Sequence, residues 1–356
     1  MSKEFNTTGT CIPEVHYMVD TSNKLAQIRE LIDRKKYFTI NRGRQYGKTT
    51  TLAALRRLLA AEYTVISTSF QGVGNDSFAN EEAFCQTFLH RIKKQLRFSG
   101  ATEVYKDWDQ DVRNLDELSD LITERCINEK IVLMIDEVDQ ASDFRTFLRF
   151  LSMLRDKFLW RNEGLDATFH SVVLAGVYDI KNIKLKMIDD GFYQPVEGER
   201  KIASPWNIAI SFDVEMSFCA EEIATMLVAY ERDYHTGMDI QDISEEIYGY
   251  TNGYPFLVSQ VCKHIHEKLG RDWTRLGVSE AVKLMIEDPA PTTLFDDLFK
   301  NMKNNEELSN FLYDILLAGK KYRFARGIEV IDIGLRYAFI SVINREIQIH
   351  NKIFEV

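Results

Sequence analysis

The chain has 356 residues, a formal net charge of −10 and 45% hydrophobic residues, a composition that is ordinary for a globular protein of two or three domains. It excludes collagen-like and intrinsically disordered chains, and no apolar run reaches the roughly 18–20 residues that cross a bilayer, so no membrane partner is expected. The negative charge argues against a large nucleic-acid footprint. Five widely spaced cysteines without a Cys-x-x-Cys pair predict reduced thiols in a cytoplasm and no zinc site.

The first part of the chain alternates helical patterns with short β-type runs. Apolar residues at helical spacing predict helices at 22–35, 50–61, 78–96, 116–126 and 143–158. Strands are expected at 37–40, 63–70, 131–135 and 171–177. The run at 131–135 is unbroken and apolar, which is typical of a strand buried on both faces of a parallel sheet. This order predicts an α/β fold, a parallel sheet with helices on both faces.

The alternation stops near residue 205. Helices are expected at 220–234, 240–250 and 255–269, which predicts a helical second domain. From Leu294 the sequence indicates further helices, then short strands around 328–331 and 346–349. Helices followed by a terminal hairpin resemble a winged-helix module. We therefore expect three domains, at residues 1–210, 211–291 and 292–356.

A glycine-containing loop between the first strand and an amphipathic helix is the strongest motif. It ends in an intact Gly-Lys-Thr, which in this context indicates a phosphate-binding P-loop. Gly47 lets backbone N–H groups approach phosphates, Lys48 places a charge between them, and Thr49 offers a hydroxyl to Mg²⁺. Arg42 stands where the usual pattern has glycine, which predicts an altered loop entry. The candidate nucleotide-binding residues are Arg42, Gly43, Arg44, Gln45, Tyr46, Gly47, Lys48, Thr49 and Thr50.

An acidic pair follows the buried strand at 131–135. Asp136 and Glu137 are expected at the carboxyl edge of the sheet, where ligands bind in open α/β folds. Asp136 would hold Mg²⁺ together with Thr49, because Mg²⁺ prefers one or two carboxylates plus phosphates and waters. Glu137 would orient or deprotonate the attacking water, so Glu137 and Lys48 are the candidate catalytic residues. For nearby Asp139, a solvated or helix-capping role is expected rather than metal binding.

The next buried strand ends at Val177 and leaves two interpretations open. Tyr178 or Asp179 would report on the γ-phosphate of a bound nucleotide, or Asp179 would merely cap the residues that follow.

These motifs together resemble the AAA-like P-loop ATPases of bacteria, close to the STAND and Orc-like branch of the additional-strand, catalytic-glutamate class. The segments that carry the resemblance are 9–20, 38–50, 169–182 and 204–209, and the likeness covers nearly the whole chain. It implies ATP and Mg²⁺ as cofactors, a helical lid after residue 215 and a winged-helix-like final segment. It also implies that the turn at 251–257 is the lid's Gly-x-Pro motif, which places Pro255 near the nucleotide. The residues alone predict that Gly253 ends one helix and Pro255 begins the next.

The resemblance has departures. The apolar pair and Gly-Arg that contact adenine in Orc-like ATPases are missing at 17–20, which leaves Ile12, Pro13, His16 and Tyr17 as candidates. An arginine finger would be supplied by Arg155 or Arg161, or these side chains are solvated.

Three functions follow as hypotheses. The first is an ATP-hydrolysing switch, in which nucleotide re-aims the C-terminal module; a protein partner or self-association is compatible with it. The second is a module that binds nucleotide without turnover, which Arg42 favours. The third is a DNA-associated regulator that uses a basic cluster in the neutral C-terminal module, made of Lys320, Lys321, Arg323 and Arg326.

Overall fold

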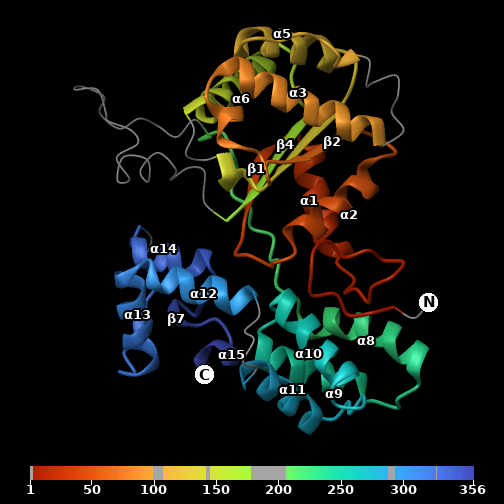
Figure 1. Ribbon diagram of the computed structural model, residues 1–356, viewed down its shortest axis with the longest axis vertical. Helices are drawn as coiled ribbons and strands as arrows, with labels where there is room; N and C mark the ends of the chain where they lie inside the picture. The colour runs from red at the N-terminus through yellow and green to blue at the C-terminus, as the bar shows by residue number, and fades with distance from the viewer. Residues whose placement is uncertain (1–2, 99–106, 142–144, 178–205, 288–292, 326) are drawn as a thin grey trace. The chain divides into compact units, whose positions relative to one another are not determined.

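The computed structural model describes residues 3–98, 107–141, 145–177, 206–287, 293–325 and 327–356 (Figure 1). The chain forms two compact units. The sheet unit contains Leu25–Asn41 and Thr51–Val214, and the second unit contains Met1–Lys24, Arg42–Thr50 and Glu215–Val356. The division near Glu215 is close to the expected boundary at 210, but the N-terminal segment and the glycine-containing loop group with the C-terminal part of the chain. The three expected domains stay a prediction.

The sheet unit is built on four parallel strands, as predicted. They are β1 (Tyr37–Asn41), β2 (Thr64–Ser69), β3 (Ile131–Asp136) and β4 (Ser171–Gly176), arranged in the order β1-β4-β3-β2. Ile40 lies opposite Ala175, and Val173 opposite Met134, so β4 lies between β1 and β3. A single parallel bridge from Phe38 to Ile210 continues the sheet beyond β1. The additional strand that the resemblance implies is therefore present, as β4.

Helices cover both faces of this sheet. One face carries α1 (Ser22–Asp33) and α2 (Lys48–Leu59), whose apolar stripes pack on Phe38, Ile40 and Met134. The other carries α3 (Glu81–Phe98), α5 (Leu115–Cys126) and α6 (Arg145–Glu163). Every residue of β3 and of β4 is buried, which explains their continuous apolar sequences.

Four helices begin the C-terminal part of the second unit. They are α8 (Ala220–Tyr234), α9 (Ile240–Thr251), α10 (Pro255–Glu267) and α11 (Arg275–Glu287), of which α11 had no counterpart among the predicted elements. The Asp239 side chain accepts the Asp242 N–H at the start of α9, and Pro255 is the first residue of α10. The N-terminal segment belongs to the same unit, because Phe5 and Tyr17 pack against Tyr230 of α8.

The final segment contains α12 (Thr293–Lys303), α13 (Glu306–Leu316), β5 (Tyr322–Arg323), α14 (Glu329–Arg336), β6 (Ile340–Ile343), β7 (Glu346–Ile349) and α15 (Lys352–Glu355). The short strands form an antiparallel sheet in the order β5-β7-β6. The strand expected around 328–331 is wrong, because this stretch starts α14 and buries Val330, Ile331 and Gly334 at helical spacing. The element order is compatible with the winged-helix prediction, which stays a prediction.

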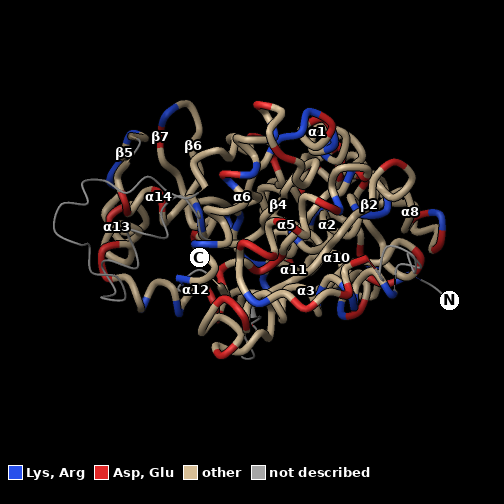
Figure 2. The backbone as a smooth tube through the Cα atoms, turned by 90° about the horizontal axis from the view of Figure 1, so that it is seen from above, with Lys and Arg blue, Asp and Glu red and all other residues tan. Residues whose placement is uncertain are grey.

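Charges are mixed along the surface helices. Figure 2 shows basic and acidic residues interspersed along α1, whereas α8 carries acidic residues and one basic residue, Arg232. Within the described part of the chain, no helix combines the length and the apolar character that crossing a bilayer requires.

Candidate functional site

The acidic pair lies at the carboxyl end of β3, in the sheet unit. Asp136 is buried; one of its carboxylate oxygens, Oδ1, accepts the Glu137 N–H at 2.9 Å, and its backbone carbonyl accepts the Phe70 N–H at 3.0 Å. Glu137 has a φ of 51°, a left-handed conformation that is uncommon outside glycine and costs roughly 1 kcal/mol or more. Strained backbone of this kind clusters at active sites and ligand clamps, which makes Glu137 a candidate functional residue.

Asp139 is half-buried and hydrogen-bonds the end of the neighbouring strand, and whether it also caps the helix that follows stays a prediction. It lies in the short 3₁₀ turn η2 (Val138–Ala141), and its Oδ2 accepts the Val177 N–H at 2.6 Å. A Cβ on Gly176 would come within 2.9 Å of Asp139 Oδ1, so the absence of a side chain at Gly176 lets this carboxylate approach the end of β4. The carboxylate therefore joins η2 to β4.

The same edge of the sheet carries the start of the glycine-containing loop. Because the strands are parallel, Asn41 of β1, Gly176 of β4 and Asp136 of β3 all lie at the carboxyl edge. The loop leaves β1 directly after Asn41 and ends where α2 begins, at Lys48. Chain connectivity thus gives the strand–loop–helix context that a P-loop requires.

Within the loop, the lysine is enclosed by its own backbone. Lys48 is only 6% exposed, and its Nζ donates to the carbonyls of Arg42 and Gly43, each at 2.9 Å. Gly47 has a φ of +77°, which L residues adopt only with strain. Thr49 is exposed, whereas Thr50 Oγ1 accepts the Cys11 N–H at 3.1 Å. The Lys48 ammonium is therefore held at the start of the loop, where Arg42 replaces the usual glycine.

The middle of the loop is attached to the rest of the second unit. The Tyr46 hydroxyl lies 2.6 Å from Ser217 Oγ and 3.0 Å from His350 Nε2, and its ring packs edge-on against Tyr254 at 4.6 Å between centroids. Tyr254 in turn donates its hydroxyl to the Arg44 carbonyl at 2.6 Å. The loop thus contacts the turn between α9 and α10 and the residue that follows β7.

A chain of hydrogen bonds fixes the tautomer of His350. Asn351 Oδ1 accepts the Phe354 N–H at 3.0 Å, so the Asn351 amide turns its Nδ2 toward His350 Nδ1, at 3.1 Å. Nδ1 must then accept, and Nε2 carries the proton that it donates to Tyr46. Burial lowers the pKa of His350 to about 4, against an opposing effect of the Glu215 carboxylate. Burial likewise raises the pKa of Tyr46 to about 12, so both groups are neutral near pH 7.

Two further loop residues contact the final segment. Arg44 pairs with Asp297 of α12 at 3.3 Å. A Cβ on Gly43 would lie 3.3 Å from the Tyr337 carbonyl at the end of α14, so Gly43 suits this close approach.

The turn before α10 has a clear structural basis. Gly253 has a φ of +68°, and a Cβ there would lie 1.8 Å from the Phe218 carbonyl oxygen, so only glycine fits. Pro255 is buried at the first position of α10. The Asn252 amide donates to the His350 carbonyl at 2.9 Å. The structural role of the turn is confirmed, and contact between Pro255 and a nucleotide stays a prediction.

Two adenine candidates have other partners. His16 Nδ1 accepts the Ile12 N–H at 2.8 Å, and Tyr17 is buried and donates to Asp233 Oδ2 at 2.6 Å. Ile12 is 42% exposed.

The two arginine-finger candidates are hydrogen-bonded to residues of the sheet unit, to which they themselves belong. Arg161 donates to the backbone carbonyls of Phe169, His170 and Lys35, and Arg155 donates to Asn207. Arg161 therefore has a structural role.

The remaining candidates are Tyr178, Asp179 and the basic cluster of the final segment. Tyr178 and Asp179 fall outside the described residues. In the basic cluster, Lys320 pairs with Asp314 at 2.9 Å, Lys321 and Arg323 are exposed, and Arg326 lies outside the described residues.

Comparisons with known proteins agree with this architecture. The chain is similar to the solved structure of the Walker-type ATPase PABY2304 of Pyrococcus abyssi, with a TM-score of 0.63 and 14% identity over 99% of this chain and 98% of that one. It is also similar to the ORC2 protein of Aeropyrum pernix in its ADPNP–ADP complexes, with a TM-score of 0.52 and 13% identity over 97% and 92% of the two chains. No curated protein matches the sequence. A family model described as an AAA-like domain matches residues 14–325. The chain therefore belongs to the AAA-like domain family and has the fold of Walker-type P-loop ATPases.

Proposed function

We propose that this protein binds ATP and hydrolyses it with Mg²⁺, and that it acts as a nucleotide-controlled switch. The observation that carries the proposal is the placement of two motifs on one sheet. The Gly-Lys-Thr loop follows β1, and the Asp136–Glu137 pair ends β3, at the same carboxyl edge and with β4 between them.

The residue types of the two motifs suit a magnesium–triphosphate. An exposed threonine hydroxyl and a buried carboxylate, from Thr49 and Asp136, are the oxygen donors that Mg²⁺ takes alongside phosphates and waters. When bound, Mg²⁺ would neutralise charge on the phosphate oxygens. The backbone N–H groups before Lys48 would cradle the phosphates, and the Lys48 ammonium would exchange its two carbonyl acceptors for phosphate oxygens.

Glu137 would act on the attacking water. Its carboxylate would accept the proton of a water placed in line with the terminal phosphate, which is the role of a general base. The left-handed backbone at Glu137 supports this role, because strained backbone of this kind clusters at active sites.

The switch rests on the attachments of the loop. Tyr46 and Arg44 lie between Arg42 and Lys48 and contact Ser217, Tyr254 and His350. A rearrangement of the loop around phosphates would therefore change its contacts with the α9–α10 turn and the final segment.

The test is phosphate release from Mg-ATP by the full chain. Lys48→Ala should abolish nucleotide binding, and Glu137→Gln should bind ATP normally but reduce turnover by about a hundredfold or more. Lys130→Ala and Glu124→Gln are matched controls, because both side chains are exposed. Activity that persists unchanged in Lys48→Ala would remove the proposal.

A non-hydrolysing nucleotide module is the second candidate. Arg42 at the loop entry, with its carbonyl on Lys48, favours it. Calorimetry separates the two: equal, tight ATP binding by wild type and Glu137→Gln with no phosphate release from either would establish a binding module.

DNA association through the C-terminal cluster is a weaker candidate, because Asp314 partly neutralises Lys320. True phosphate contacts would make affinity fall steeply with salt, and a flat response would exclude them.

A further inference from the structure

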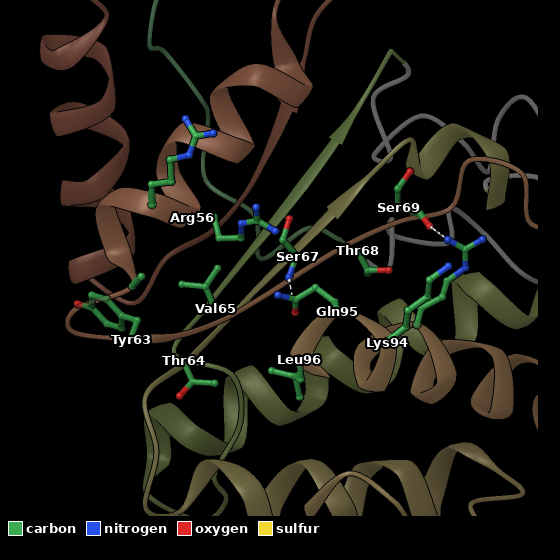
Figure 3. A pocket seen from close by; sticks show the side chains of 13 residues that line it. Arg56, Tyr63, Thr64, Val65, Ser67, Thr68, Ser69, Lys94, Gln95 and Leu96 are labelled. Atoms are coloured by element: carbon green, nitrogen blue, oxygen red, sulfur yellow. Dashed lines mark hydrogen bonds between the residues drawn. The ribbon is translucent and has the colours of Figure 1, made fainter. Parts of the chain in front are cut away.

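A basic groove lies beside the free edge of the sheet, in the sheet unit. Its cavity measures about 770 Å³ and is formed between α2, α3 and the edge strand β2. Arg56 and Arg57 come from α2, Arg91 and Lys94 come from α3, and the β2 side chains Ser67 and Thr68 lie between the helices (Figure 3). We use "basic groove" for the cavity bounded by these residues.

The four cations of the basic groove are not neutralised by the described residues. No described carboxylate lies within 4 Å of Arg56, Arg57, Arg91 or Lys94, although acidic residues outnumber basic ones in the whole chain by 54 to 44. Burial lowers the pKa of Arg91, and no acidic neighbour offsets this effect. Elsewhere many arginines of this chain are paired, as Arg29 is with Glu62 and Arg275 with Asp242.

The edge of β2 is closed to another strand. In a parallel edge strand, alternate residues turn their N–H and C=O groups outward. Here the Gln95 side chain accepts the Ser67 N–H at 3.3 Å, and Arg91 donates to the Ser69 carbonyl at 2.5 Å. A peptide that added as a strand would have to displace both α3 side chains, so main-chain pairing does not explain the groove.

We propose that the basic groove binds a small organic polyanion, one that carries two or more phosphate or carboxylate groups. Cations on both sides of a concave cavity suit an anion held from two directions, and the Ser67 and Thr68 hydroxyls add donors. The volume lies in the range of small-molecule sites, about 300–1,000 Å³. Tyr63, Val65 and Leu96 contribute apolar surface for an organic body.

A long nucleic acid fits this site less well. Its affinity comes from many phosphate contacts spread along a basic surface. The net charge of −10 would oppose such a polymer beyond the groove. A compact anion meets only the focused local field of the four cations.

The lining of the basic groove shares no residue with the two motifs of the proposed nucleotide site, although Ser69 of the lining lies opposite Asp136 in the β2–β3 register. Each residue that lines the cavity belongs to the sheet unit, and none belongs to the Arg42–Thr50 loop. The inference therefore does not depend on ATP binding, and it is tested in a Lys48→Ala background so that the loop does not take up the probe.

The experiment is calorimetric titration of inorganic tripolyphosphate into full-length Lys48→Ala protein. Adding Arg56→Ala with Arg57→Ala should weaken binding by about tenfold or more, and Lys94→Ala should weaken it severalfold. Arg34→Ala with Arg113→Ala is the charge-matched control, since both side chains are more than 60% exposed and lie outside the groove; it should change affinity less than about twofold. Hydrogen exchange should show protection at 64–69 and in α3 when the probe binds.

Three results would overturn the proposal. One is no tripolyphosphate binding up to about 1 mM. Another is an equal loss of affinity in the control pair, which would indicate a nonspecific charge effect. The third is a single-stranded oligonucleotide or an acidic peptide that binds more tightly than tripolyphosphate and is weakened by the same groove variants. That result would assign the groove to a macromolecule.

Discussion

Acidification should weaken the attachment of the final segment to the glycine-containing loop, because it protonates His350. The ring is 8% exposed, and its Nδ1 already accepts from the Asn351 amide, so a second ring proton would face an N–H donor. The pKa is lowered to about 4 by burial, below the ordinary value of 6.5. The unfolded chain therefore takes up this proton first. The stability that neutral His350 contributes is present above pH 6.5 and is lost as the pH falls toward 4.

The size of the effect follows from the two pKa values. Between about pH 7.5 and about pH 5, linkage predicts a loss of about 2 kcal/mol from this one residue, which grows to about 3 kcal/mol near pH 4. Total folding free energies are roughly 5–15 kcal/mol, so such a loss would be readily measured.

The direct assay is a titration of His350 followed by NMR of its ring Cε1–H, with a midpoint near 4 expected. Urea unfolding at each pH provides the second measurement. His350→Gln should remove about 2 kcal/mol of the pH dependence while other histidines continue to titrate. A midpoint at 6.5 or above, or parallel pH profiles for wild type and His350→Gln, would refute the arrangement of His350, Asn351 and Tyr46.

Further variants test other parts of the structure. Asp166→Ala leaves the buried Lys157 ammonium without the carboxylate that it contacts at 2.7 Å, and thermal unfolding should show a loss of about 3 kcal/mol in folding free energy. Asp156 is exposed, so Asp156→Ala should lower the folding free energy by less than about 0.5 kcal/mol. Gly253→Ala should destabilise the second unit strongly, but Gly249→Ala, with open space at its Cβ in α9, should stabilise by about 0.5–1 kcal/mol; equal effects would contradict the close approach. Tyr46→Phe should bind nucleotide severalfold more tightly if the loop tether opposes binding, and unchanged calorimetric affinity would exclude that coupling.

Most of the fold could be predicted because its elements follow local rules. β3 is apolar throughout since both faces of the sheet are covered, and α8 was predicted with its observed bounds, Ala220–Tyr234. The error at 328–331 has a specific cause. Val330 and Ile331 are β-branched and favour strands, but in the structure they pack with Gly334 on one face of a helix. The segment is too short for its hydrophobic periodicity to distinguish a helix from a strand.

The site could be predicted only where a motif is continuous in sequence. Lys48, Thr49, Asp136 and Glu137 are such motif residues. Strand order puts Asp136 and the start of the glycine-containing loop at the same edge of the sheet, and the roles of the four residues stay a prediction. His350 is different, since it is 304 residues from its partner Tyr46 and belongs to no motif that we identified. Contacts of this kind depend on tertiary packing, which hydrophobic periodicity does not specify.

The loop's own hydrogen bonds explain why phosphate binding and loop attachment should be linked. Lys48 Nζ now uses the carbonyls of Arg42 and Gly43, and a phosphate that takes over Nζ leaves these carbonyls needing new donors. The backbone of the loop entry must then turn. Tyr46 lies between the loop entry and Lys48, and its hydroxyl is hydrogen-bonded to Ser217 and His350. Because the loop is held at its entry, at Tyr46 and at Lys48, a movement of the entry would strain the hydrogen bonds of Tyr46. The proposed switch therefore acts through the loop and the side chains that hold it, Ser217, Tyr254 and His350.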